Sequence, residues 1–253
     1  MASIDRNGVR IAYEVHGSAG RTPVLLSHGY SASSGMWSAN LAALSADRQV
    51  VTWDMRGHGH SDSPGDPSAY SQAASVDDMA AVLDACGMTR AVVGGLSLGG
   101  YLSLAFHRAH PGRVAGLLLF DTGPGFTRDD ARLEWNAWAE SMAESFDRAG
   151  TAALPAIPEA GTGPQNPPGL ALAARGILPQ DDDAVIRSLP SIGVPTLVVV
   201  GAHDHPFLKA ADYMTARIPG ARKVVIAASG HVPNMENPSA FNDAVTAFLT
   251  EIA

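Results

Sequence analysis

The sequence predicts an α/β protein with a mostly parallel sheet that is flanked by helices and interrupted by a helical insertion. Short apolar runs rich in Val and Leu recur along the chain, and near-continuous apolarity is typical of strands that are covered on both faces. Stretches with apolar residues at 3-4 spacing separate these runs, so strands and helices alternate. One long segment between residues 121 and 196 contains no such run.

The chain is expected to open on a β-hairpin over residues 3–15, because Asn7-Gly8 supplies the positive φ angles of a two-residue turn. The later apolar runs predict strands at 23–28, 49–54, 91–96, 114–121, 196–201 and 223–227. The intervening periodicity predicts helices at 73–85, 98–110, 129–148, 207–218 and 240–252.

The insertion divides the chain into a core of residues 1–123 and 191–253 and a helical segment of residues 124–190. A connection of this length is uncommon in a compact domain unless it is functional, as a lid is. Trp135, Trp138, Met142 and Phe146 form an apolar stripe along its first helix. This stripe either packs the insertion onto the core or, through Trp138 and Met142, lines a substrate pocket.

The composition argues against several classes of function. The chain has 25 acidic residues against 17 Lys and Arg, with no basic cluster, so nucleic acid is a poor partner. Cys86 is the only cysteine, which excludes an intrachain disulfide and a thiolate metal cluster. No apolar run approaches the roughly 20 residues that span a bilayer, and the N-terminus lacks a secretory h-region. We expect a soluble cytoplasmic protein without a membrane partner; the oligomeric state is not readable.

The strongest chemical signal is Gly95-Leu96-Ser97-Leu98-Gly99, which lies between an expected strand and an expected helix. Glycines two residues on either side of the serine allow a sharp strand-to-helix turn. Such a turn lifts the serine hydroxyl above the edge of the sheet. Ser97 is therefore the predicted nucleophile.

A serine hydroxyl needs a base, and His231 is the predicted one. It follows Ser229-Gly230 just beyond the last expected strand. His58 and His60 lie in a glycine-rich turn instead, where we expect solvated loop residues.

The imidazole in turn needs a carboxylate to orient it and to stabilise its cation. Asp204 follows the expected strand 196–201, and the order Ser97, Asp204, His231 fits this architecture. Asp121 is the alternative, because it also ends an apolar strand, although a loop or cap carboxylate is the simpler interpretation. The oxyanion of the tetrahedral intermediate needs donors, and the backbone N–H groups of Leu98 and Tyr30 are the candidates.

Together these segments resemble the α/β-hydrolase family over essentially the whole chain. The matching segments are His28-Gly29 for the oxyanion loop, residues 54–61 for the D-x-R-G-x-G-x-S turn, residues 95–100 for the nucleophile elbow, residues 201–204 for the acid loop and Gly230-His231 for the histidine loop. The resemblance implies that residues 124–190 form a cap over the active site and that Asp54 and Arg56 have no chemical role. Dehalogenases and epoxide hydrolases of this fold use an aspartate nucleophile, so Ser97 argues against both.

The leading hypothesis is a carboxylesterase that acts on small to medium, largely uncharged esters and needs no cofactor or metal. A lactonase or a carbon–carbon bond hydrolase acting on a keto-acid is the enzymatic alternative. Its substrate carboxylate would require a cap arginine, for which Arg132, Arg148 and Arg175 are available. Perhydrolysis is a conceivable side activity. A ligand-binding protein on a hydrolase scaffold is the non-catalytic alternative, which would bind a ligand without turnover.

Overall fold

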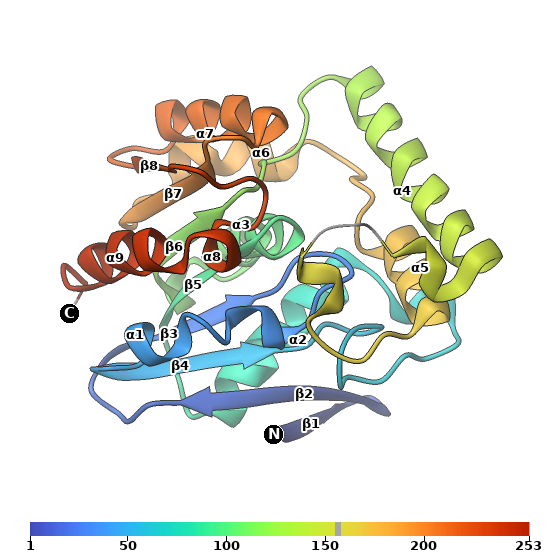
Figure 1. Cartoon of the computed structure of the whole chain (residues 1–253), viewed down its shortest axis with the longest axis horizontal. Coiled ribbons are helices and arrows are strands. Elements are labelled where there is room, and N and C mark those ends of the chain that lie inside the picture. Colours follow the sequence, from blue (N-terminus) through green and yellow to red (C-terminus); the bar gives the residue numbers. More distant parts are fainter. Residues whose placement is uncertain (155–157, 253) are drawn as a thin grey trace.

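A computed structural model describes residues 1–154 and 158–252 and has at its centre an eight-stranded, mostly parallel sheet (Figure 1). The strand order is β1-β2-β4-β3-β5-β6-β7-β8, and only the β1/β2 and β2/β4 pairs are antiparallel. The strands are β1 (Ala2–Arg6), β2 (Val9–His16), β3 (Arg21–Ser27), β4 (Arg48–Trp53), β5 (Ala91–Leu96), β6 (Val114–Phe120), β7 (Thr196–Gly201) and β8 (Arg222–Ile226). The predicted fold class is confirmed.

Helices cover both faces of the sheet. One face is covered by α1 (Leu41–Leu44) and α9 (Pro238–Leu249), and the other by α2 (Gln72–Ala85), α3 (Leu98–Ala109) and α7 (His205–Arg217). In Figure 1, α1 and α9 lie in front of the strands and α2 lies behind them. The parallel strands therefore have two buried faces, which explains their continuous apolarity.

The core consists of two clusters that share the strands of the sheet. In β3, Val24 and Leu26 face the α1/α9 side and Leu25 faces the α2/α3 side, and all three side chains are buried. This alternation follows from the two-residue period of a strand. Each such side chain stabilises the fold by about 1.5–3 kcal/mol relative to an exposed one.

Element boundaries differ from the predictions mainly at helix starts. Helix α7 begins at His205 and α9 begins at Pro238, both two residues earlier than expected, and each has a proline in its first turn. Proline suits this position because the first helical N–H groups have no intrahelical acceptor. The hairpin turn is as predicted, with positive φ angles at Asn7 and Gly8.

The segment between β6 and β7 contains helices and no strand within the described residues. It contains α4 (Asp129–Ala149), α5 (Pro167–Gly176) and α6 (Ala184–Ser188), with short 3-10 turns η4 (Gly150–Ala153), η5 (Pro158–Gly161) and η6 (Leu189–Ser191). Part of the predicted insertion, residues 155–157, lies outside the described residues. Helices α4 and α5 contact each other beside the sheet (Figure 1). None of the helices in the described ranges is both long and apolar enough to cross a bilayer.

Candidate active site

Ser97 lies at the sharp turn between β5 and α3. Its backbone has a φ of 53° and a ψ of −115°, a left-handed conformation that is rare for a residue with a side chain. Close backbone approach requires the flanking glycines: a Cβ at Gly95 would lie 2.4 Å from the Ser27 carbonyl oxygen, and one at Gly99 would lie 2.3 Å from the same atom. The turn is also fixed by the Ser97 N–H, which donates to the Phe120 carbonyl at 2.9 Å.

The loop after β3 passes directly beside this serine. A Cβ on Gly29 would lie 3.7 Å from the Cβ of Ser97. The Tyr30 ring is buried and its hydroxyl donates to the Leu170 carbonyl at 2.8 Å, which ties the loop to α5. Within the described ranges, neither the Tyr30 N–H nor the Leu98 N–H donates to a protein acceptor. Both amides belong to segments that adjoin Ser97, as an oxyanion hole requires.

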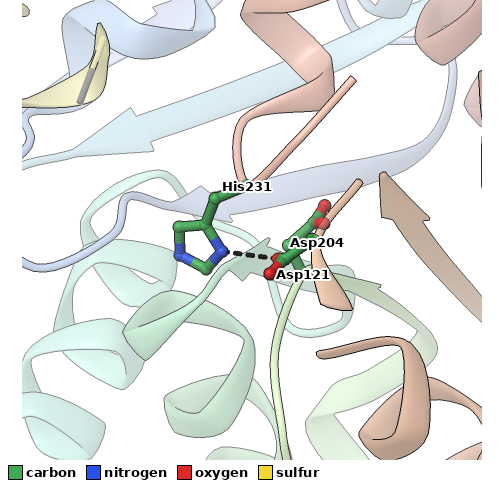
Figure 2. A group of neighbouring side chains, drawn as sticks. All are labelled: Asp121, Asp204 and His231. Carbon is green, nitrogen blue, oxygen red and sulfur yellow. Dashed lines mark hydrogen bonds and ion pairs between the residues drawn. The ribbon is translucent and has the colours of Figure 1, made fainter. Parts of the chain in front are cut away.

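His231 and Asp204 form a direct hydrogen bond. The Nδ1 atom of His231 lies 2.7 Å from Oδ2 of Asp204 (Figure 2). Asp204 is 6% exposed and follows β7, whereas His231 is partly exposed on the loop after β8. The ring of His231 packs on Phe207, with centroids 4.9 Å apart. This bond fixes Nδ1 as the donor, which leaves Nε2 as the acceptor nitrogen of the neutral ring.

Asp121, the alternative acid, lies behind this pair rather than on the histidine. It directly follows β6, is 1% exposed and accepts a hydrogen bond from the Gly201 N–H at 2.8 Å through Oδ1. Burial, the largest cause, and neighbouring Asp204 together raise the pKa of its carboxyl group to about 9. The sequence distinguished the two acids by chain order, but it did not predict that both lie at one site.

Asp121, Asp204 and His231 are also the group of side chains that could hold a metal in the described part of the chain, since one ligand-type atom from each lies within 4.8 Å of the others. A tetrahedral zinc ion would separate a nitrogen and an oxygen ligand by about 3.3 Å. The Asp204 and His231 atoms are only 2.7 Å apart. That distance fits a shared proton better than a shared metal.

The turn at residues 54–61 is held by hydrogen bonds inside the protein. Both carboxylate oxygens of Asp54 accept backbone N–H groups, from Ser34 at 2.6 Å and from His60 at 2.8 Å. Arg56 forms a two-bond ion pair with buried Asp78, at 2.6 Å and 2.8 Å. All these donors and acceptors stabilise the turn, in keeping with the expectation that Asp54 and Arg56 do no chemistry.

The expectation that His58 is a solvated loop residue is wrong. The ring is 1% exposed and lies between His28, with centroids 5.0 Å apart, and Tyr30, with centroids 5.6 Å apart. The turn is covered by the start of α5, so closely that a Cβ at Gly57 would lie 2.6 Å from the Gly169 carbonyl oxygen. A contact between segments this far apart in the chain leaves no local sequence signal.

A cavity of about 360 Å³ opens above Ser97. Aromatic and aliphatic side chains line most of it, from the core and from the insertion: Tyr30, Leu98, Tyr101, Phe126, Trp135, Trp138, Leu178 and Phe207. Gln180 adds a polar group, and its buried Oε1 has no hydrogen-bond partner in the described ranges. Phe207 links the cavity to the histidine, because it lines the cavity and stacks on His231.

The stripe on α4 divides between the cavity and the core. Trp135 and Trp138 line the cavity, whereas Phe146 is buried and Met142 packs against the core cluster without being part of the cavity lining. Tyr101, Gln180 and Phe207 carried no sequence signal for a pocket, because only the folded chain brings α3, α7 and the segment after α5 together.

The three candidate arginines of the insertion pair with acids instead of lining the cavity. Arg132 binds Asp129, Arg148 binds Glu144, and Arg175 binds Glu140 and Asp147. No Lys or Arg occurs among the residues that line the described cavity.

Comparisons with known proteins point to one family. A family model described as the alpha/beta hydrolase family matches residues 24–244. The chain is 27% identical to a putative 2-succinyl-6-hydroxy-2,4-cyclohexadiene-1-carboxylate synthase of Bacillus subtilis (97% of each chain) and 30% identical to a putative carbamate hydrolase of Caulobacter segnis (94% of this chain, 96% of the relative). Among solved structures, a thermophilic esterase from Thermogutta terrifontis superposes with a TM-score of 0.83 at 29% identity, covering 99% of this chain and 97% of that one.

The matched range runs from the middle of β3 into α9 and includes the serine turn, both aspartates and the histidine. Relatives match the chain over nearly its whole length, so the likeness is not confined to one motif. The chain belongs to the alpha/beta hydrolase family.

Proposed function

We propose that the protein is a carboxylesterase that hydrolyses small to medium, largely uncharged esters through Ser97, His231 and Asp204. One observation carries the proposal: the 2.7 Å Asp204–His231 bond orients a ring that packs on Phe207, a wall of the cavity that Ser97 also lines. A nucleophile in a cavity, with a base and an orienting acid beside a wall of that cavity, supplies the parts of acyl transfer.

The proposed reaction has two halves. Ser97 Oγ attacks the ester carbonyl carbon while His231 Nε2 takes the hydroxyl proton, and the N–H groups of Leu98 and Tyr30 stabilise the oxyanion. The imidazolium then gives its proton to the departing alkoxide oxygen, which leaves an acyl-enzyme. Water attacks this acyl group, His231 takes the water proton, and the proton returns to Ser97 as the carboxylic acid leaves.

The cavity supports the proposed substrate class. Its lining is mainly aromatic and aliphatic, and its volume of about 360 Å³ fits a small or medium acyl or aryl group. Several polar groups of the lining are already used within the protein: Tyr30 OH by Leu170, Tyr101 OH by Gln72, and Trp135 Nε1 by Leu178. An uncharged substrate therefore matches these walls better than an ionised one. Trp135 and Trp138 come from the 124–190 segment, which supports its proposed role as a cap.

The apolar lining of the cavity weighs against the keto-acid alternative. A substrate that bears a carboxylate needs a cationic partner in an apolar site, and the described lining offers neither Lys nor Arg. Uncharged lactones remain within the proposed class, because their ring ester reacts by the same steps. The putative carbamate hydrolase among the relatives makes simple carbamates a useful further substrate to assay.

The test is a substrate screen with a nucleophile variant. Purified protein is assayed with p-nitrophenyl esters of increasing acyl length, uncharged lactones, a carbamate and a keto-acid. We expect hydrolysis of the short and medium esters, and Ser97→Ala should lower kcat by about 10⁶-fold, as removal of the nucleophile does in other Ser-His-Asp enzymes.

Ser103→Ala is the matched control. Ser103 is buried in α3, and its hydroxyl donates only to the Gly99 carbonyl at 2.7 Å. This variant should keep most of the activity. If wild-type protein hydrolyses no ester but cleaves the keto-acid, or if folded Ser97→Ala keeps a sizeable fraction of the activity, the proposed function is wrong.

A further inference from the structure

Asp121 is a buried acid for which ester hydrolysis by the three proposed residues has no use. It is 1% exposed and has a φ of 41°, in the left-handed region. Its Oδ1 accepts a hydrogen bond from the Gly201 N–H at 2.8 Å. No described residue donates a hydrogen bond to its other oxygen, the buried Oδ2. An ionised carboxylate would leave that second oxygen with an uncompensated buried charge, which is costly.

The surroundings make an anion at Asp121 still less favourable. Asp204 and His231 are its immediate neighbours, within 4.8 Å (Figure 2). The other charged groups that act on this cluster are also acids, Glu236 from α8 and Glu159 from η5. No lysine or arginine among the described residues pairs with Asp121 or Asp204. Two like charges at this spacing in a buried site raise the free energy of the doubly ionised state.

We propose that Asp121 is protonated in the resting enzyme and that its Oδ2–H donates a hydrogen bond to the Asp204 carboxylate. Asp121 is then a positioning residue, which acts on His231 through Asp204. This inference rests on the proposed function for its effect on catalysis. The proton itself is a property of the folded protein and can be tested without any substrate.

The hydrogen-bond pattern assigns the proton to one atom. Oδ1 of Asp121 already accepts from Gly201, so Oδ2 is the oxygen left to carry hydrogen, and Asp204 accepts it beside the oxygen that binds His231 Nδ1. Burial raises the pKa of Asp121 to about 9, which keeps it neutral at pH 7. The pair of acids then carries a single negative charge, which balances the imidazolium that forms during acyl transfer.

Two substitutions of Asp121 test whether it acts as a neutral hydrogen-bond donor or as a negative charge. Asp121→Asn keeps the shape, the acceptor for Gly201 and a donor for Asp204. It should hold kcat/KM for p-nitrophenyl acetate within about threefold of wild type at pH 7. Asp121→Ala removes the donor, and kcat should fall about 10- to 100-fold, the range for losing a hydrogen bond to a charged group. If Asn falls as far as Ala, the proposal is wrong.

The pH profile is the second readout. As wild-type Asp121 loses its proton near pH 9, the site gains a second negative charge and the donor to Asp204 is lost, so kcat should fall. Asp121→Asn cannot ionise and should lack this basic limb. Identical basic limbs in the two proteins would overturn the proposal.

Stability provides a readout that needs no activity. The folded pKa of Asp121 lies above its unfolded value of about 3.9, so its contribution to stability is complete below pH 4 and is lost as pH rises towards 9. The Tm of Asp121→Asn relative to wild type should therefore increase steadily between pH 4 and 9. A Tm difference that does not depend on pH would contradict a protonated Asp121.

Wild-type protein labelled with carbon-13 at aspartate carboxyl carbons makes the test independent of any variant's folding. One carboxyl resonance should titrate near pH 9. Titration of every aspartate below pH 6 would refute the inference. A protein with this resonance but without esterase activity would refute the proposed function alone.

Discussion

Two groups of buried carboxylates differ in how completely their oxygens are hydrogen-bonded, although each group includes an acid that directly follows a strand of the sheet. In the first group, Asp54 directly after β4 accepts two backbone N–H groups, and Asp78 of α2 pairs with Arg56. After β6 and β7, Asp121 and Asp204 lie together, and one Asp121 oxygen has no partner among the described residues.

The two groups differ in what balances the negative charge of each buried carboxylate. In the first group each charge is balanced by an arginine or by backbone dipoles, so nothing is left to react with a ligand. In the second group the partner is the histidine His231, whose own charge would change in the proposed proton transfer. Both groups therefore contain an acidic residue at the carboxyl edge of the sheet, and the partner of the acid distinguishes a structural site from the proposed reactive one.

Asp204→Asn tests the proposed difference between the two groups of acids most strongly. The amide cannot stabilise an imidazolium and favours the wrong tautomer of His231, so kcat should fall by about 10⁴-fold, while the Tm changes by only a few degrees. Asp212→Asn is the matched control, because Asp212 is an exposed acid on α7 that pairs with Lys223. A loss of less than tenfold in folded Asp204→Asn would place the two groups of acids in the same structural class.

Arg56→Ala is expected to lower stability strongly and to leave kcat nearly unchanged, the reverse of Asp204→Asn. Removing Arg56 leaves Asp78, which is 0% exposed, without its main partner. Breaking a buried pair in this way costs about 3–5 kcal/mol, measurable by urea unfolding, while kcat of the folded fraction should stay near wild type.

Arg6→Ala is the control for that experiment. Arg6 reaches the same Asp78 at a longer distance of 3.3 Å, and its side chain is 29% exposed. Its loss should cost about 1 kcal/mol or less. If both variants lose the same stability, Arg56 is not the compensating charge, and if Arg56→Ala abolishes activity while folded, the first group is not merely structural.

The sequence was informative where local chemistry determines the structure. The strand-to-helix turn at Ser97, the strand ends that carry Asp204 and His231, and the parallel sheet all follow from short apolar runs and glycine spacing. These features depend on backbone conformation within a few residues, which the residue types constrain directly.

The rest depends on contacts between distant segments. Nothing near Asp121 in the sequence indicates that Gly201 and Asp204 lie beside it, and nothing near Gln180 or Tyr101 indicates the same cavity. The short helix α1 was missed because four residues carry too little periodicity. His58 was misjudged because its turn contains no clue that the start of α5 covers it.

His58 offers the finest test, because one of its ring nitrogens has no partner although the ring lies in the turn that holds Asp54 and Arg56. Its Nδ1 lies 3.0 Å from the Arg56 carbonyl oxygen, and its buried Nε2 has no partner in the described ranges. Burial, the largest cause, and the neighbouring His28 together lower the pKa of this ring to about 3.

The folded pKa lies below the unfolded value of about 6.5, so the stability contributed by neutral His58 is present above pH 6.5 and is lost as pH falls towards 3. His58→Phe loses one hydrogen bond and should be less stable by about 1 kcal/mol at pH 8. Between pH 8 and pH 5 the free energy of unfolding of His58→Phe should rise by about 2 kcal/mol relative to that of wild type. The reason is that His58 takes up a proton in the unfolded wild-type chain at pH 5, which Phe cannot do.

Urea unfolding at pH 8, 6 and 5 measures this change, with exposed His203 replaced by Phe as the control. An unchanged difference between His58→Phe and wild type across these pH values would mean that the buried ring takes up its proton without unfolding. Asp121 would then be the group whose pKa is shifted by folding, whereas the turn around His58 would accept a charged ring without unfolding. A difference that instead shifts in favour of His58→Phe as the pH falls shows that the buried His58 ring has to stay neutral in the folded protein.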